Sequence, residues 1–230
     1  MSAELPLRAV SGLDELIDYY RAAPIGVRAN MIFSADGAAA FGGRVGSLSD
    51  PTDQRLLVAL RGFADVVLVG AATARAENYG PVKPSATTTG STARIAVVSR
   101  SGRLPDSLLA DPAQRPILVT SARAVSEHGL DREKRWELLI AGTDTVDVRA
   151  MVIELRQRGL GRVLCEGGPT LLDELVGADL VDEICVTLAP KLAGARLPGG
   201  GDGLLSAPTA LRLDHVLNHR DYLYLKYSRR

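Results

Sequence analysis

The sequence predicts an α/β protein with a mostly parallel central sheet, helices on both faces and a C-terminal antiparallel hairpin. Three observations predict this fold. Short apolar runs alternate along the chain with segments of helical character, as in parallel sheets with crossover helices. Gly and Pro mark many of the connections between them. Two β-rich runs flank residues 218–221, which indicates a hairpin that adds antiparallel edge strands. Since no internal repeat or linker divides the chain, we expect one domain over residues 1–230, with a core of about residues 25–228.

The N-terminal part of the chain predicts a helix, a strand, a loop and a second helix. First come a short helix opened by Ser11, a buried strand and a loop rich in Gly and Ala, over residues 13–21, 25–33 and 34–49. Asp50 is then a suitable N-cap, and Pro51 suits the first position of the second helix. One apolar stripe of that helix would face the core, and it consists of Leu56, Leu57 and Leu60.

From residue 65 onward the pattern is dominated by strands. Short apolar runs predict strands at 65–70, 95–98, 116–119, 136–140, 162–165 and 182–188. Helices are expected at 71–77, at 147–158 with Gly159 as the stop, and at 170–176. Residues 78–92 are rich in Pro, Ser and Thr and predict a surface loop. The hairpin strands are expected at 211–216 and 222–227.

Composition excludes several classes of function. Lys and Arg number 27 and balance 27 Asp and Glu, so no basic patch for nucleic acid is expected, and 4% aromatic residues are too few for base stacking. No apolar run has membrane-spanning length, and residues 1–10 lack the features of a signal peptide. The two cysteines lie in apolar runs and are expected to be buried thiols, and with three histidines they fit no zinc spacing. We therefore expect a cytoplasmic protein without a metal that binds a small molecule.

The turn at residues 166–170, Glu-Gly-Gly-Pro-Thr, joins an expected strand to an expected helix. A helix N-terminus exposes unpaired N–H groups and the positive end of the helix dipole. Gly167 and Gly168 would let a ligand approach the backbone, and Pro169 presets the first helical turn. These features favour a pyrophosphate site, and the alternative is a purely structural turn. The sequence has no Gly-Lys-Ser/Thr loop, which disfavours nucleotide hydrolysis.

Several motifs, taken in order, resemble the reductase domain of bacterial riboflavin biosynthesis, which has the dihydrofolate reductase fold. The turn at 166–170 is followed by Val-Asp-Glu at 181–183 and Ala-Pro-Lys-Leu-Ala-Gly at 189–194. Earlier matches are Ser-Ala-Asp-Gly at 34–37, Gly-Ala-Ala-Thr at 70–73 and Val-Ser-Arg at 98–100. The resemblance extends from about Arg28 to Tyr227 and implies a stand-alone reductase, because the zinc motifs of the family's deaminase domain are absent from this sequence.

The resemblance implies NADPH as the cofactor. Ser99 and Arg100 follow a strand, where ligands gather in open α/β sheets, and a hydroxyl beside a guanidinium suits the 2′-phosphate. A solvated loop arginine is the alternative for Arg100. Ile32 occupies a position at the nicotinamide end, and Thr73 matches a threonine that contacts the cofactor. The full set of expected cofactor contacts is Ile32, Thr73, Glu77, Ser99, Arg100, Gly167, Gly168, Pro169, Thr170 and Leu171.

Three residues are expected on the substrate side. Asp53, in the first turn of its helix, is the candidate catalytic residue, because dihydrofolate reductases use a carboxylate there to bind the N–C–NH₂ edge of a pterin. The alternative for Asp53 is that it complements the helix dipole. Arg61 and Glu166 match substrate contacts of the riboflavin reductases. The alternative for Arg61 is purely structural, because it is a cation near the C-terminus of a helix.

The substrate side also departs from the family pattern. Ser47 stands where the family often has tryptophan, and residues 77–79, Glu-Asn-Tyr, replace Asp-Asp-Pro. We therefore expect an NADPH-dependent reductase of a pyrimidine, 5-amino-6-(5-phosphoribosylamino)uracil, or of a pterin such as dihydrofolate, and a homodimer as is common in the family. Two alternatives stay open: a non-catalytic NADPH-binding module, and an interaction domain in which the glycine turn is structural.

Overall fold

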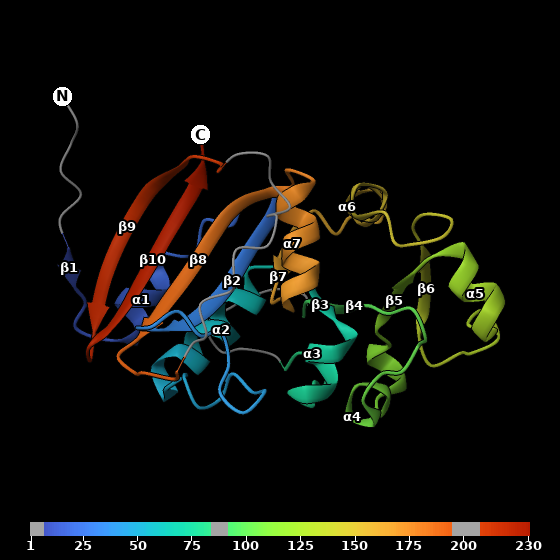
Figure 1. Ribbon diagram of the computed structural model, residues 1–230, viewed down its shortest axis with the longest axis horizontal. Coiled ribbons are helices and arrows are strands. Elements are labelled where there is room, and N and C mark those ends of the chain that lie inside the picture. The colour runs from blue at the N-terminus through green and yellow to red at the C-terminus, as the bar shows by residue number, and fades with distance from the viewer. Residues whose placement is uncertain (1–6, 84–91, 195–207) are drawn as a thin grey trace.

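The computed structural model describes residues 7–83, 92–194 and 208–230, and in these ranges ten strands form one sheet (Figure 1). The strands are β1 (Arg8–Ala9), β2 (Gly26–Ser34), β3 (Val66–Gly70), β4 (Arg94–Val98), β5 (Ile117–Thr120), β6 (Glu137–Ile140), β7 (Arg162–Cys165), β8 (Val181–Ala189), β9 (Leu211–His219) and β10 (Tyr222–Arg229). The helices are α1 (Leu13–Asp18), α2 (Pro51–Gly62), α3 (Ala71–Ala76), α4 (Asp106–Leu109), the 3₁₀ turn η1 (Pro112–Gln114), α5 (Ala122–His128), α6 (Val148–Gln157) and α7 (Pro169–Gly177).

The strand order is β1-β9-β10-β8-β2-β7-β3-β4-β5-β6. Every pair from β8 to β6 is parallel, whereas β10 is antiparallel to both β8 and β9. Figure 1 shows the hairpin β9–β10 toward one end of the sheet and α5 at the other. The predicted fold class, with its mostly parallel sheet and C-terminal hairpin, is confirmed.

Both faces of the parallel part of the sheet are buried under helices. Along β3, Val67 and Val69 pack into a core with α1, α2, α3 and α4, whereas Val66 and Leu68 pack into a second core with α6 and α7. Successive side chains of a strand point to opposite faces, so a strand buried on both faces requires a continuous apolar run. This requirement explains why the strand at 65–70 could be predicted without any alternating pattern.

Helix α2 begins and packs as its sequence predicts, with one correction. The carboxylate of Asp50 accepts a hydrogen bond from the backbone N–H of Asp53 at 2.8 Å, and Pro51 occupies the first turn. Leu56 and Leu60 are buried in the core. Leu57 is not part of the same buried stripe, because it lies on the side of the helix that faces a cavity, and Ala59 is buried in its place.

The hairpin forms around a two-residue turn. Arg220 and Asp221 have φ values of 49° and 68°, which is the left-handed conformation that two-residue hairpin turns require. Both strands are longer than predicted, since β9 continues to His219 and β10 to Arg229. The hydrophobic pattern therefore located the turn better than it located the strand ends.

Several short elements differ from the prediction. Helix α1 ends at Asp18 and has Gly12 at its N-cap, while Ser11 lies one residue earlier and its N–H and hydroxyl both bind Glu15. Four elements of the structure were not predicted from the sequence: β1, α4, η1 and α5. Residues 78–83 form neither helix nor strand, and residues 84–91 of the predicted surface loop lie outside the described residues. None of the helices in the described ranges has the length and apolar character needed to cross a bilayer.

Candidate functional site

Two glycine turns meet at the carboxyl ends of β3 and β7. The N–H of Gly70 donates to the carbonyl of Gly167 at 2.9 Å, and Gly167 has a φ of +85°. A Cβ added at Gly168 would lie 2.5 Å from Thr73 Oγ1, so only glycine lets these two turns approach this closely. The contact brings the first turn of α7 beside α3, and Thr73 stands at the junction.

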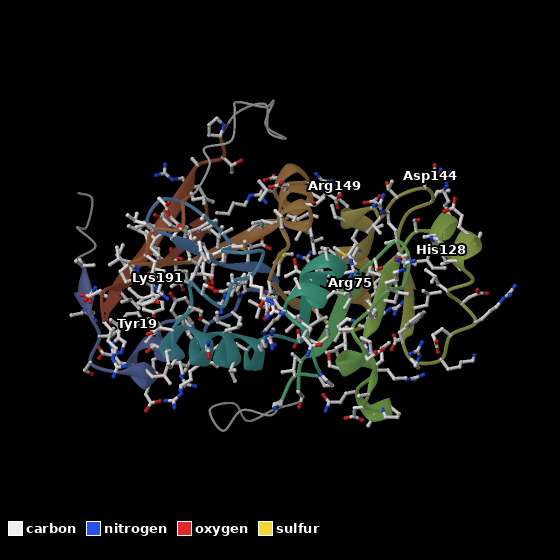
Figure 2. All side chains as sticks on the ribbon, turned by 60° about the horizontal axis from the view of Figure 1, so that its bottom comes forward. Tyr19, Arg75, His128, Asp144, Arg149 and Lys191 are labelled. Carbon is white, nitrogen blue, oxygen red and sulfur yellow. The ribbon has the colours of Figure 1, made fainter. Side chains whose placement is uncertain are left out.

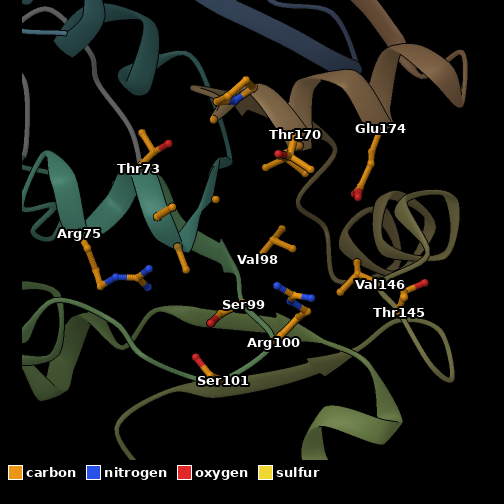
Figure 3. Close-up of a pocket in the computed structure, with 16 residues that line it drawn as sticks. Thr73, Arg75, Val98, Ser99, Arg100, Ser101, Thr145, Val146, Thr170 and Glu174 are labelled. Carbon is orange, nitrogen blue, oxygen red and sulfur yellow. The ribbon is translucent and has the colours of Figure 1, made fainter. Parts of the chain in front are cut away.

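A cavity of about 560 Å³ opens between α3, the end of β4 and the start of α7 (Figure 3). Seven of the predicted cofactor residues line it: Thr73, Ser99, Arg100, Gly168, Pro169, Thr170 and Leu171. Gly168 is the N-cap of α7, and since glycine has no side chain, no side chain caps the free N–H groups of the first turn. The α7 N-terminus therefore presents backbone donors and the positive end of its dipole at this cavity.

Two arginines extend into the first cavity. Figure 3 shows Arg75 and Arg100 pointing inward from two sides, with Ser99 between them. The guanidinium of Arg75 donates to the carbonyl of Arg103 at 2.8 Å, which fixes its direction. Ser99 is buried, and its Oγ accepts a hydrogen bond from the N–H of Gly102 at 3.1 Å, so its own hydroxyl hydrogen can serve a ligand. Arg75 was not predicted as a site residue, although the sequence places this cation two residues after Thr73.

A second cavity of about 350 Å³ lies on the other side of Thr73, which lines both cavities. The predicted substrate residues Asp53, Arg61 and Glu166 all line it. Two predicted cofactor residues, Ile32 and Glu77, line this second cavity and not the first. Glu77 accepts a hydrogen bond from the N–H of Val45 at 2.9 Å and so holds the loop at residues 34–49. Gly167 lines neither cavity, because its carbonyl is turned toward Gly70.

Asp53 is placed in the wall of the second cavity by the start of α2. The hydroxyl of Ser49 donates to Asp53 Oδ2 at 2.6 Å. Burial raises the pKa of Asp53, and hydrogen bonds from Ser49 and Thr187 oppose that rise. The nearby charges act in opposite directions, since Asp50 raises the pKa of Asp53 and Lys191 lowers it. The result is a carboxyl group that takes up a proton more readily than an exposed aspartate does.

Arg61 and Glu166 bind each other. Arg61 Nε and Nη2 donate to Glu166 Oε1 and Oε2, each at 2.7 Å, and the hydroxyl of Tyr79 donates to Glu166 Oε2 at 2.5 Å. Desolvation lowers the pKa of Arg61, but the adjacent Glu166 outweighs it and holds that pKa above its usual value. Burial and Glu166 raise the pKa of Tyr79. Tyr79 was not predicted as a site residue.

The second cavity is rich in hydrogen-bond acceptors. Among the described residues that line it, three carry carboxylates, namely Asp53, Glu77 and Glu166, and one is a cation, Arg61. Since Arg61 pairs with Glu166, the remaining charge is negative. Such a cavity suits a ligand that presents N–H or NH₂ donors.

None of the cysteines or histidines in the described ranges lines either cavity. Cys165 and Cys185 are buried thiols, as predicted. His128 is exposed, whereas His215 is buried in β9 against Tyr19 and Tyr20. Within the part of the chain that the structure describes, no three His, Cys, Asp or Glu side chains are grouped as metal ligands.

Sequence comparison identifies relatives over most of the chain. The model of the RibD C-terminal domain family matches residues 26–223. The 2,5-diamino-6-ribosylamino-4(3H)-pyrimidinone 5′-phosphate reductase of Methanothermobacter thermautotrophicus is 28% identical over 190 residues, which are 80% of this chain and 88% of the relative. The enzyme of the same name from Archaeoglobus fulgidus is 29% identical over 160 residues, 65% of this chain and 72% of the relative. The resemblance predicted from the ordered motifs is confirmed.

Solved structures show the same fold. A pyrimidine reductase-like protein of Corynebacterium diphtheriae superimposes with a TM-score of 0.77 at 26% identity, over 94% of this chain and 98% of its own. The diaminohydroxyphosphoribosylaminopyrimidine deaminase/5-amino-6-(5-phosphoribosylamino)uracil reductase of Thermotoga maritima superimposes with a TM-score of 0.70 at 19% identity, over 90% of this chain and 57% of its own.

Proposed function

Because the chain belongs to the RibD C-terminal domain family, we propose that it is an NADPH-dependent reductase of a pyrimidine or pterin in or near riboflavin biosynthesis. One observation carries the proposal: Thr73 lines both an acceptor-rich cavity and a cavity that is bordered by two arginines and the N-terminus of α7. A dinucleotide in the first cavity could thus bring its reactive ring to the edge of the second.

The residues of the first cavity fit NADPH. The uncapped first turn of α7 would hold the pyrophosphate through its N–H groups, with Thr170 and Leu171 as the donors. Arg100, Arg75 and the Ser99 hydroxyl would bind the 2′-phosphate, a dianion that charge-assisted hydrogen bonds recognise well. When bound, NADPH supplies a hydride, while the protein supplies position and polarity.

The described residues of the second cavity would hold and protonate the substrate. Asp53 would bind the substrate through its carboxylate, or deliver a proton when it is protonated, and Ser49 fixes its direction. Ile32 lines the same cavity as Thr73 and would give it an apolar wall beside the substrate. The ion pair of Arg61 with Glu166, completed by Tyr79, would form a rigid polar wall.

The carboxylate of Asp53 favours a substrate with a 2-amino group. A carboxylate accepts two parallel hydrogen bonds from an N–C–NH₂ edge, which pterins and 2,5-diaminopyrimidinones both possess. A uracil has a carbonyl at C2 in place of the amine, so one Asp53 oxygen would face an acceptor. We therefore rank the 2,5-diaminopyrimidinone ribosyl phosphate and dihydrofolate above 5-amino-6-(5-phosphoribosylamino)uracil.

Steady-state oxidation of NADPH with each of these three compounds tests the proposal. The two 2-amino compounds should be reduced with a higher kcat/KM than the uracil. Failure of all three to support NADPH oxidation would contradict the proposed function.

The alternative of a non-catalytic NADPH-binding module is favoured by one observation. Arg61 and Glu166, both expected to contact substrate, satisfy each other in this structure. Calorimetry and turnover together distinguish the two functions, because a sensor would bind NADPH tightly and reduce no pyrimidine or pteridine.

We also propose a homodimer formed through the open face of the antiparallel strands. Alternate residues of β8 and β10 give that face a half-buried apolar surface: Ile184, Val186, Leu188, Leu223, Leu225 and Tyr227. Val186 and Leu225 are cross-strand neighbours at its centre. Sedimentation velocity should show a dimer that Leu225→Asp converts to a monomer, and a monomeric parent chain would contradict the assignment.

Two further expectations stay predictions. A cytoplasmic location is checked by fractionation of cells that produce the protein. A single domain over residues 1–230 predicts one cooperative unfolding transition.

A further inference from the structure

Lys191 holds the loop that leads into α2. Its Nζ donates to the carbonyl oxygens of Ser47, Leu48 and Ser49, at 2.8, 3.1 and 3.5 Å. An ammonium group has three N–H donors and no acceptor, so the three carbonyls use all of them. Figure 2 shows Lys191 far from Arg75, which borders the first cavity, so the lysine is not part of the anion-binding site.

The backbone of Lys191 joins two further segments. Its N–H donates to the carbonyl of Ala189 at 2.8 Å, and its carbonyl accepts from the N–H of Ala35, just after β2, also at 2.8 Å. The hydroxyl of Tyr222 donates to the carbonyl of Leu48 at 2.9 Å, and Lys191 Nζ lies 5.9 Å from the Tyr222 ring centroid. The ends of β2 and β8 and the start of β10 thus meet the loop at one lysine.

The held loop controls a side chain of the second cavity. Ser49, whose carbonyl Lys191 binds, donates through its hydroxyl to Asp53. Residues 42–44 and 46–47 are exposed and belong to no helix or strand. Side chains hold this stretch at Val45 through Glu77, at Leu48 through Tyr222 and at residues 47–49 through Lys191. Loss of the ammonium would leave the carbonyls of Ser47 and Ser49 without this donor and the carbonyl of Leu48 with the Tyr222 hydroxyl alone, which would allow Ser49 to move.

We propose that Lys191 is a positioning residue, whose ammonium fixes the carbonyls of Ser47, Leu48 and Ser49 and thereby sets Ser49 and Asp53 for the substrate. This inference rests on the proposed function, because Asp53 is assigned there to the substrate. Two charged groups act on the pKa of Asp53: Asp50, the N-cap of α2, raises it, and Lys191 lowers it. Tyr224 on β10 also lies near Asp53, whose charge raises the pKa of that tyrosine. Lys191 lowers the pKa of Asp53, so its removal should raise the pH at which Asp53 titrates.

The test compares Lys191→Met and Lys191→Arg with Lys134→Met, a control at an exposed lysine outside both cavities. In Lys191→Met, amide hydrogen exchange over residues 45–54 should become faster, and kcat/KM should fall roughly 10- to 100-fold, as expected for a displaced reacting group. The apparent pKa of kcat/KM should rise, while the Kd for NADPH stays unchanged. Lys191→Arg keeps the charge and should retain the wild-type pH profile, and the control should behave as wild type throughout.

Hydrogen exchange and enzyme kinetics together distinguish a failure of the positioning role of Lys191 from a failure of the proposed function. Wild-type exchange at residues 45–54 in a folded Lys191→Met variant would overturn the positioning role. An unchanged pH profile with a lower kcat/KM would also overturn it, because loss of packing alone would explain that result. If the wild-type protein reduces no substrate, the proposed function fails, and hydrogen exchange still decides the role of Lys191. If Lys191→Met does not fold, Lys191→Arg takes its place, with Tyr222→Phe as a reference variant that loses one neutral hydrogen bond to Leu48. The hydrogen-exchange rate of residues 45–54 in Lys191→Arg should lie between the rates of wild type and Tyr222→Phe. A rate below that of wild type would contradict the role.

Discussion

Arg61 and Glu166, 105 positions apart in the chain, form a two-bond ion pair in which both N–O distances are 2.7 Å. Their side chains are 19% and 4% exposed, so the pair lies largely out of water at the wall of the second cavity. The pair also connects α2 to the turn between β7 and α7, which ties the substrate side of the site to the cofactor side.

Removing the guanidinium should destabilise the protein strongly. Among the described residues, Arg61→Met leaves the buried Glu166 carboxylate with Tyr79 as its remaining side-chain partner, and breaking a buried pair in this way costs about 3–5 kcal/mol. Urea denaturation measures the free energy of unfolding. The double variant Arg61→Met/Glu166→Gln should recover part of the loss, because no unpaired charge is left. A change below about 1 kcal/mol in the single variant, as for a solvated surface pair, would contradict the buried pairing.

Replacing Asp53 by asparagine should separate stability from substrate binding. The pKa of Asp53 is raised in the folded state, so the protonated form stabilises the fold and the carboxylate at neutral pH opposes it. That stabilisation is present below the unfolded pKa and is lost as the pH rises through the folded pKa. Asp53→Asn should therefore match or exceed the wild-type Tm at pH 7, yet lose binding of the 2-amino substrates while keeping NADPH affinity. Retained substrate affinity would contradict the anchoring role.

The arginines of the first cavity should determine the choice between NADPH and NADH. Arg100→Ala should weaken the binding of NADPH by roughly 1.5–3 kcal/mol, which is the contribution of a hydrogen bond to a charged group. The binding of NADH should change little. Arg75→Ala should act in the same direction. Arg132→Ala is the matched control, since Arg132 is exposed and lines neither cavity. Isothermal calorimetry with both cofactors checks the prediction, and an equal loss for NADPH and NADH would exclude a 2′-phosphate role.

The contact between Gly168 and Thr73 predicts a coupled pair of substitutions. Gly168→Ala alone would place a Cβ 2.5 Å from Thr73 Oγ1 and should destabilise the fold by about 1–3 kcal/mol, as overpacking does. Thr73→Ala removes that oxygen, and the next atom, Thr73 Cβ, is 3.8 Å away, an ordinary contact. The double variant should therefore lose less free energy of unfolding than the two single variants lose in sum. Additive effects in a double-mutant cycle would show that the two turns do not touch in solution.

The sequence predicted the parallel strands best, because a strand buried on both faces has a continuous apolar run. Strand β7 begins and ends where it was predicted, and Asp50 caps α2 as expected. Helix α5 was missed although Ser121 caps its start and Gly129 ends it in the left-handed conformation. A helix of seven residues has too few apolar positions to establish a helical period.

The two cavities depend on different kinds of information in the sequence. Residues 168–171, which line the first cavity, form one continuous turn whose chemistry is local in the sequence. The substrate side depends on pairings between distant segments, such as Arg61 with Glu166 and Lys191 with the loop at 47–49. The position of Ile32 and Glu77 at the second cavity also depends on how the elements pack, and residue spacing in the sequence does not reveal that packing.

The central claim is that a hydride passes from NADPH in the first cavity to a substrate in the second. A single-turnover reaction with NADPH in which both hydrogens at the nicotinamide C4 are deuterium, followed by mass spectrometry of the product, tests it most directly. We predict that the reduced 2,5-diaminopyrimidinone or tetrahydrofolate product contains one deuterium from the cofactor. Tight NADPH binding with no deuterium in any pyrimidine or pteridine product would contradict a reductase and favour a cofactor-binding module.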